Sequence, residues 1–171
     1  MLKPQDIVTL LKVHSWGPVR DWTYSTLAID LGMSASSVYE ALQRASSAGL
    51  YDTDNKKVKK HALLEFLVHG LRYVFYAHPG PVSRGIPTAH SAEPLKSLLV
   101  ADLADVYVWP TPTGDIRGQA IAPLYRSVPF AAQKDPELYV LLSLIDAIRV
   151  GRVREQRFAA KELSQRLTVA Q

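Results

Sequence analysis

Two apolar stripes with helical spacing follow each other between residues 23 and 50. The first recurs at positions i, i+3, i+4 and i+7 and consists of Tyr24, Leu27, Ala28 and Leu31. The second has the same kind of spacing and consists of Val38, Ala41, Leu42 and Ala45. The remaining face of the second segment is mostly polar. The pattern predicts two short amphipathic helices, each of which buries one face.

The residues between the two stripes predict a tight turn. Gly32 directly follows the first stripe, where the end of a helix favours a residue that tolerates a left-handed backbone. The Ser34 hydroxyl is placed to accept from the free N–H groups at the start of the second helix. Gly49 is expected to end that helix. A helical hairpin of this kind also occurs as a simple packing unit, and that alternative stays open.

The motif residues of the hairpin are Leu27-Ala28, Leu31-Gly32-Met33-Ser34, Val38, Leu42 and Ala48-Gly49-Leu50. They resemble the helix-turn-helix of bacterial winged-helix transcription regulators, of which the MarR-like proteins are one branch. The resemblance covers about residues 4–60, a third of the chain. It implies a sequence-specific transcription regulator, most often a repressor, that binds double-stranded DNA as a homodimer.

In such a fold the second helix of the pair reads bases in the major groove. The polar side chains expected to face the groove are Ser36, Ser37, Tyr39, Glu40, Gln43 and Arg44. Glutamine suits adenine and arginine suits guanine, whereas serine tolerates either. Glu40 has two interpretations: it accepts from cytosine N4, or it pairs with Arg44 one turn further along the helix.

The segment after Gly49 predicts a short basic hairpin, the wing of such a fold. A strand is expected to begin at Leu50-Tyr51, and residues 52–55 are typical of a turn. Four cations follow in five residues, namely Lys56, Lys57, Lys59 and Lys60. Beside a reading helix these lysines are expected to contact DNA phosphates, whereas alone they would indicate a solvated turn. Trp22 is expected in a very short strand against this hairpin.

The whole pattern predicts an α+β fold with three parts. These are a winged helix over 1–60, a small α+β extension over 61–134 and C-terminal helices over 135–171. Helices are predicted at 3–13, 61–71, 95–103, 136–150 and 153–167. Strands are predicted at 72–77, 106–109 and 115–122, the last two as an antiparallel hairpin. Residues 78–94, with four prolines, are expected to form a long loop.

The C-terminal helices carry long apolar faces beside exposed cations. Such faces commonly join the two copies of a winged-helix regulator, and a two-fold dimer would present two reading helices about 34–36 Å apart. The alternative is that these helices fold back on their own domain.

The composition indicates the general class of the protein but not what it binds. The chain has 171 residues and a net charge of +4, which is mild for a protein that only coats nucleic acid. It has no apolar run of about 18 residues and no signal-peptide core, so we expect a cytoplasmic protein without a membrane segment.

Nothing in the sequence indicates an enzyme, a cofactor or a metal site. The chain lacks a phosphate-binding loop, a nucleophile elbow and a dinucleotide fingerprint. It has five histidines, no two of them four residues apart, and no cysteine that could serve as a ligand. Ser83 or Ser91 beside His90 comes nearest to a catalytic group, but any chain of this size offers such a combination.

Two other functions remain open. An antitoxin-like protein would bind a partner protein through residues 61–134, and the long loop would suit that role. A ligand-sensing regulator would line an apolar pocket with its aromatic residues, namely Tyr73, Phe75, Tyr76, Tyr107 and Trp109. A cavity among these aromatics would favour sensing, and an exposed apolar patch would favour a partner.

Overall fold

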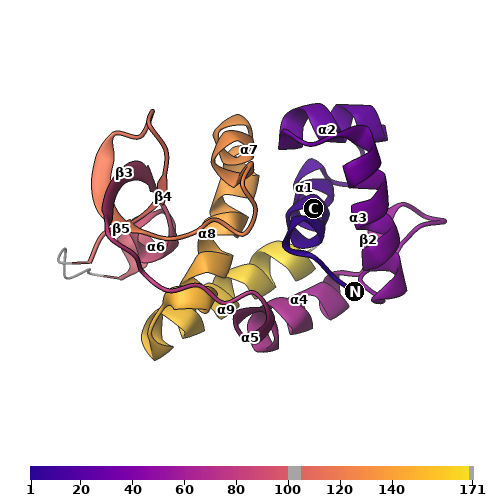
Figure 1. Cartoon of the computed structure of the whole chain (residues 1–171). Coiled ribbons are helices and arrows are strands. Elements are labelled where there is room, and N and C mark those ends of the chain that lie inside the picture. Colours follow the sequence, from indigo (N-terminus) through magenta and orange to yellow (C-terminus); the bar gives the residue numbers. More distant parts are fainter. Residues whose placement is uncertain (100–104, 170–171) are drawn as a thin grey trace.

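The computed structural model describes residues 1–99 and 105–169 and has an α+β fold (Figure 1). The N-terminal half contains α1 (Pro4–Trp16), α2 (Tyr24–Leu31), α3 (Ala35–Ser47), β1 (Tyr51–Asp52), β2 (Lys57–Val58), α4 (Lys60–His69) and α5 (Leu71–Val74). The C-terminal half contains β3 (Val82–Pro87), the 3-10 helix η1 (Ala89–Ser91), α6 (Leu95–Leu98), β4 (Tyr107–Pro110), β5 (Ile116–Ala120), α7 (Val128–Lys134), α8 (Pro136–Val150) and α9 (Val153–Thr168). No helix in these ranges is long and apolar enough to cross a membrane.

Helix α8 forms the centre of the core. It contacts α1 on one side and η1 on the other, and α9 packs along it. Figure 1 shows α8 between the barrel strands and the group formed by α1, α2 and α3. Residues 141–148 of α8 are all buried, and α9 buries Ala159, Leu163 and Leu167. The apolar faces of α8 and α9, which were predicted to form a homodimer, are therefore buried within the chain. This agrees with the alternative that these helices fold back on their own domain.

Helix α3 has the cap predicted at Ser34, and α2 has a cap that was not predicted. The Thr23 hydroxyl accepts from the backbone N–H of Thr26 at 3.1 Å. The Ser34 hydroxyl accepts from the backbone N–H of Ser37 at the same distance. Gly32 adopts φ +65°, in the left-handed region that glycine enters without steric cost. These local interactions fix the end of α2 and the start of α3.

Helix α7 lies outside the predicted elements and packs on α2 beside the turn. Figure 1 shows the two helices facing each other. A Cβ placed on Gly32 would lie 3.0 Å from Cδ1 of Phe130, so a side chain at this position would meet α7 as well as an unfavourable backbone angle. The turn of the helix-turn-helix is thus held from outside by the C-terminal half.

A buried lysine joins α1 and α2 to the C-terminal half. Lys12 is fully buried, and its Nζ lies 2.8 Å from Asp135 Oδ2 and 3.1 Å from Asp30 Oδ2. Asp135 also caps α8 by accepting from the Leu138 N–H at 3.1 Å. Burial by itself would raise the pKa of Asp135, but the hydrogen bonds from Lys12 and Ser15 outweigh it and hold that pKa below its usual value. The two ion pairs connect α1, α2 and the start of α8.

Strands β3, β4 and β5 close a small barrel. β3 is antiparallel to both neighbours, and Gly85 faces Pro110 in one ladder and Ile116 in the other. β4 and β5 run parallel, so the predicted antiparallel hairpin over 106–122 is wrong. A Cβ on Gly85 would lie 2.0 Å from the carbonyl oxygen of Trp109. Two chain segments cross so closely here that only glycine fits.

Residues 72–77 form no strand, contrary to the prediction. The chain makes a helical turn instead, and the Phe75 N–H donates to the Leu71 carbonyl at 2.8 Å. The side chains of Tyr73 and Tyr76 are 67% and 69% exposed. Aromatic and β-branched residues favour strands only where a sheet offers neighbours, and α5 packs on the helices α4 and α8.

Three smaller predictions also differ from the structure. Residues 78–94 contain β3 and η1 and are not a continuous loop. Trp22 lies in a segment without strand geometry. The helix predicted over 95–103 is observed as α6, which ends at Leu98, and residues 100–104 lie outside the described part of the chain. The other predicted helices are confirmed as α1, α4, α8 and α9 with small shifts at their ends.

Candidate nucleic-acid interface

Helix α3 has one fully buried face and one polar face that points away from the core. The buried positions are at most 1% exposed and are Val38, Ala41, Leu42 and Ala45. Among the residues predicted to face the groove, the exposed ones are Ser36, Tyr39 and Glu40, and the half-buried ones are Ser37, Gln43 and Arg44. The six residues share one helix surface but differ in their freedom to meet a ligand.

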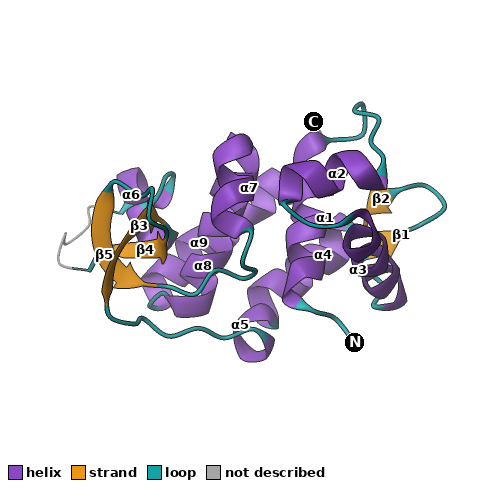
Figure 2. Cartoon of the chain, turned by 45° about the horizontal axis from the view of Figure 1, so that its top comes forward, coloured by secondary structure: helices purple, strands orange, loops and turns teal. Residues whose placement is uncertain are grey.

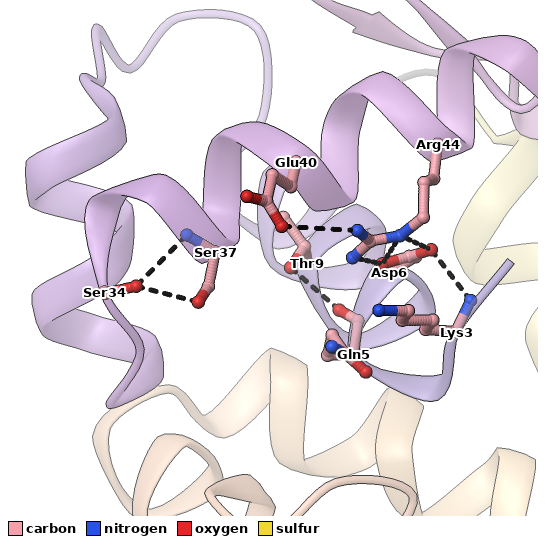
Figure 3. A network of polar contacts seen from close by, with 8 residues as sticks. All are labelled: Lys3, Gln5, Asp6, Thr9, Ser34, Ser37, Glu40 and Arg44. Atoms are coloured by element: carbon pink, nitrogen blue, oxygen red, sulfur yellow. Dashed lines mark hydrogen bonds and ion pairs between the residues drawn. The ribbon is translucent and has the colours of Figure 1, made fainter.

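Two of these side chains are held by neighbours. The ring of Tyr39 packs edge-on against that of Tyr24, with centroids 5.4 Å apart, and stays 47% exposed. The Ser37 hydroxyl lies 2.7 Å from the Ser34 hydroxyl at the start of the helix (Figure 3). Tyr39 is therefore a fixed ring at the edge of the polar face, whereas Ser37 takes part in the cap.

Arg44 points back towards the body of the domain. Its Nε and Nη2 lie 2.9 Å and 2.8 Å from the two carboxylate oxygens of Asp6, a fully buried residue of α1 (Figure 3). These hydrogen bonds raise the pKa of the Arg44 guanidinium. Its Nη1 lies 3.6 Å from Glu40 Oε2, so the alternative pairing of these two residues is present. The expected guanine contact is not supported, because the Arg44 side chain anchors α3 to α1.

The strands β1 and β2 form the predicted hairpin, with Tyr51 opposite Val58. Asp52 builds its turn by accepting from the backbone N–H groups of Asp54 at 3.0 Å and Asn55 at 3.1 Å. A further hydrogen bond from the Asn55 side chain contributes most to lowering the pKa of Asp52. The carboxylate thus stays ionised and keeps the turn closed.

The four lysines of the hairpin are available to an anionic partner. Lys56, Lys57 and Lys59 are exposed, and Lys60 at the start of α4 is half-buried. Within residues 1–99 and 105–169, none of the four forms an ion pair with a carboxylate. Figure 2 shows the loop between β1 and β2 projecting on the same side of the molecule as α3. The structure therefore places free cations beside the polar face of α3.

A cavity of about 500 Å³ lies between the hairpin, the loop after α1 and the start of α4. Its polar and aromatic lining includes His14, Arg20, Asp21, Trp22, Lys57 and Lys60. The Arg20 guanidinium lies over the Trp16 ring at 3.9 Å, and Lys56 Nζ lies 5.4 Å from the centre of the Trp22 ring. This cavity was not expected from the sequence, although Arg20 between Trp16 and Trp22 was a visible signal.

The aromatic residues suggested for a sensing pocket do not meet. Tyr73 and Tyr76 lie on the surface, whereas Trp109 is fully buried and donates from Nε1 to Asp146 at 2.6 Å. Burial raises the pKa of this carboxyl group, although Arg149 opposes the shift. The structure therefore gives no support to a ligand-sensing pocket formed by these aromatic residues.

The serine and histidine side chains considered for catalysis are engaged separately. The Ser91 hydroxyl accepts from the Tyr107 N–H at 2.9 Å, and the Ser83 hydroxyl donates to the Arg84 carbonyl at 3.2 Å. His90 is buried, and its Nε2 faces a backbone carbonyl. In the described ranges no three histidine, aspartate or glutamate side chains are grouped closely enough to hold a metal ion.

In comparisons with known proteins, no family model, no curated protein and no solved structure matches this chain. The resemblance to MarR-like winged-helix regulators thus stays a prediction from the sequence. The geometry described above stands without it.

Proposed function

We propose that the protein binds double-stranded DNA sequence-specifically and regulates transcription, with α3 in the major groove. The observation that carries this proposal is the polar face of α3 beside a hairpin with unpaired lysines. A capped helix with a solvated polar face matches the element that helix-turn-helix proteins insert between base edges. The adjacent cations supply the phosphate contacts that position such a helix.

The base contacts fall to the side chains of α3 that remain free. Gln43 is suited to the N6 and N7 atoms of adenine, and Glu40 to the N4 amino group of cytosine. Ser36 and Tyr39 lie on the same exposed face and complete the reading surface. Arg44 acts as a positioning residue, because its guanidinium is held by a buried carboxylate.

Lys56, Lys57 and Lys59 would hold phosphates. Each phosphate that a lysine neutralises releases a counterion, so log K falls with log salt by about 0.9 per contact. Lys60 is half-buried at the base of the hairpin and is the least free to reach the DNA backbone.

A protein partner is the second candidate, and one observation favours it. Tyr73 and Val74 in α5, and Tyr76 just after it, are 67%, 55% and 69% exposed. Three large apolar side chains so close together are unusual on the surface of a monomer. They would serve either a partner protein or a second copy of this chain, and a second copy would make the homodimer through this surface.

Selection from a random DNA pool tests the function without knowledge of the operator. The purified protein is incubated with the pool, bound DNA is sequenced over several rounds, and the enriched duplex is measured by fluorescence anisotropy from about 50 to 200 mM salt. We expect one enriched motif and steep weakening with salt. Equal recovery of all sequences, or no binding, would remove α3 as a reading helix.

Matched variants then separate the two kinds of contact. Gln43→Ala should weaken binding to the enriched duplex by about 1–3 kcal/mol and leave random DNA unchanged. Lys57→Ala should weaken both duplexes and lower the salt slope by about one unit. Gln165→Ala and Lys161→Ala change the same residue types at exposed positions of α9 and should leave both affinities unchanged.

A further inference from the structure

A groove of about 320 Å³ lies between the end of α4, α5, the end of α8 and the start of α9, and we call it the α5–α9 groove. Figure 1 shows α4 and α9 side by side in this part of the molecule. The apolar side chains that line the groove are Val68, Tyr73, Ile148, Val153 and Ala160. Tyr73 and Val153 come from different walls and are 67% and 62% exposed. Exposed apolar surface in a concave region is typical of a contact site.

The charges of the α5–α9 groove have one sign. Arg72 and Arg157 line it, and His69 lies in the same lining, whereas no aspartate or glutamate of the described residues does. Within residues 1–99 and 105–169, neither arginine forms an ion pair with a carboxylate. Arg157 is exposed and Arg72 is half-buried. The groove therefore offers two uncompensated cations beside apolar walls, which favours an acidic ligand.

Arg72 is held in position by neutral groups. Its Nη1 donates to the side-chain oxygen of Gln156 at 2.9 Å, and its Nη2 donates to the hydroxyl of Tyr73. The guanidinium also lies 4.6 Å from the centre of the Tyr73 ring. A guanidinium has five N–H donors, so these two bonds use only part of its capacity. Because the side chain is already ordered, it would lose little rotamer freedom when a carboxylate binds.

The combination of apolar walls and cations favours one kind of occupant over two others. A two-fold dimer would bring the same patch of both copies together, so that arginines would face arginines. A nucleic-acid strand would pair with the arginines but leave aliphatic side chains such as Val68 and Val153 without an apolar contact. A protein segment that carries apolar and acidic side chains on one face would satisfy both features of the groove.

We propose that the α5–α9 groove docks a partner protein through an acidic amphipathic segment. An apolar side chain of that segment fills the groove between Tyr73 and Val153, and its carboxylates pair with Arg72 and Arg157. Charge-assisted pairs between arginine and carboxylate are among the strong polar contacts of proteins. The proposal extends the second candidate function, because it names the site and the chemistry of the partner. It does not depend on DNA binding by α3.

Selection from a phage-displayed library of random short peptides on the full-length protein tests this proposal. We expect the enriched peptides to combine leucine, phenylalanine or similar side chains with aspartate and glutamate. One enriched peptide is then synthesised with a fluorescent label and titrated by anisotropy, beside a version in which amides replace its carboxylates. The amide version should bind at least about tenfold more weakly, because the charge-assisted bonds to the arginines are lost.

Two variants change the two kinds of side chain in the groove. Arg157→Glu reverses a charge and Val153→Ser removes an apolar contact, both at exposed positions of α9. Each should weaken the enriched peptide about tenfold or more. The matched control is Arg117→Glu, the same reversal at an exposed position of β5 outside the groove, which should leave the affinity for the peptide unchanged. Circular dichroism of all three variants checks that they fold.

The outcomes separate this proposal from its rivals and from the DNA-binding function. No enriched peptide, enriched peptides without acidic side chains, or no effect of Arg157→Glu on the peptide would overturn it. A dimer in sedimentation equilibrium that Val153→Ser dissociates would identify a second copy as the occupant and overturn it as well. Weaker binding of random DNA by Arg157→Glu than by Arg117→Glu would do the same in favour of a nucleic acid. A protein that selects an acidic peptide but no DNA would support the groove and overturn only the DNA-binding function.

Discussion

The ion pair between Arg44 and Asp6 predicts that Arg44 stabilises the fold and does not read a base. The carboxylate of Asp6 is fully buried and has two partners, the guanidinium of Arg44 and the backbone N–H of Lys3 at 2.8 Å. Arg44→Ala would leave this carboxylate with the Lys3 bond alone. Removing one partner of a buried pair costs about 3–5 kcal/mol. The Arg44 side chain is 19% exposed, so water can enter the vacated space, and we expect about 2–3 kcal/mol.

Urea unfolding followed by circular dichroism measures this cost. Arg44→Ala should lower the midpoint at an unchanged slope, which reports lost stability without a change of the unfolded state. Gln43→Ala, one residue earlier on α3, is the control and should shift stability by no more than about 0.5 kcal/mol. The double variant Asp6→Leu with Arg44→Met should be more stable than Arg44→Ala, because no buried charge is left unpaired.

The same variants decide between an anchor and a reading residue. If Arg44 is an anchor, Arg44→Ala should retain its preference for the selected duplex when the comparison is made at equal concentrations of folded protein. The reasoning would be refuted by a variant with a wild-type unfolding midpoint that no longer distinguishes a guanine in the selected motif.

Three further predictions concern two buried side chains of α1 and a glycine of the barrel. Lys12→Met should lower the free energy of unfolding by about 3 kcal/mol and with it the thermal midpoint, because Asp135 keeps its burial but loses its cation, and an unchanged midpoint would contradict this. Burial lowers the pKa of His14, so the native state binds fewer protons than the unfolded state below about pH 6.5. The free energy of unfolding measured in urea should therefore fall as the pH drops from 7.5 towards 5.5. His14→Gln should flatten that dependence. Gly85→Ala should prevent closure of the barrel, because a Cβ would lie 2.0 Å from a carbonyl oxygen, whereas Gly80→Ala, whose Cβ would lie 3.4 Å from its nearest neighbour, should fold by NMR.

The helix-turn-helix was predictable because everything that specifies it lies within a few residues. The apolar period, the left-handed Gly32 and the cap at Ser34 each act locally, and each is present as expected. Helix α8 was predictable for the same reason, since Asp135 caps its start and Gly151 follows its end. Elements with such signals need no knowledge of the rest of the chain.

The barrel was not predictable by the same reasoning, because its strands are specified by their neighbours. β3 looked like loop because prolines and glycines surround it, yet it pairs with two strands at once. The aromatic run that begins at Tyr73 looked like strand, but within residues 1–99 and 105–169 it pairs with no strand. Residues 111–115 resembled a hairpin loop, but β3 is antiparallel to both β4 and β5, which therefore pair with each other in parallel.

The pairing of Arg44 with Asp6 was not foreseen, although the first helix contains the signal for it. Helix α1 is buried from Asp6 to His14, so each charged residue in it needs a partner of opposite charge from another element. Lys12 finds two aspartates, and Asp6 finds Arg44. A charged residue in a fully buried helix therefore pairs with an opposite charge on another element. The side chain of that second residue is then held in the pair and is not free to contact a ligand. Because Arg44 is paired with Asp6, the hairpin lysines are the main cations beside α3. The salt dependence of DNA binding should therefore come almost entirely from these lysines.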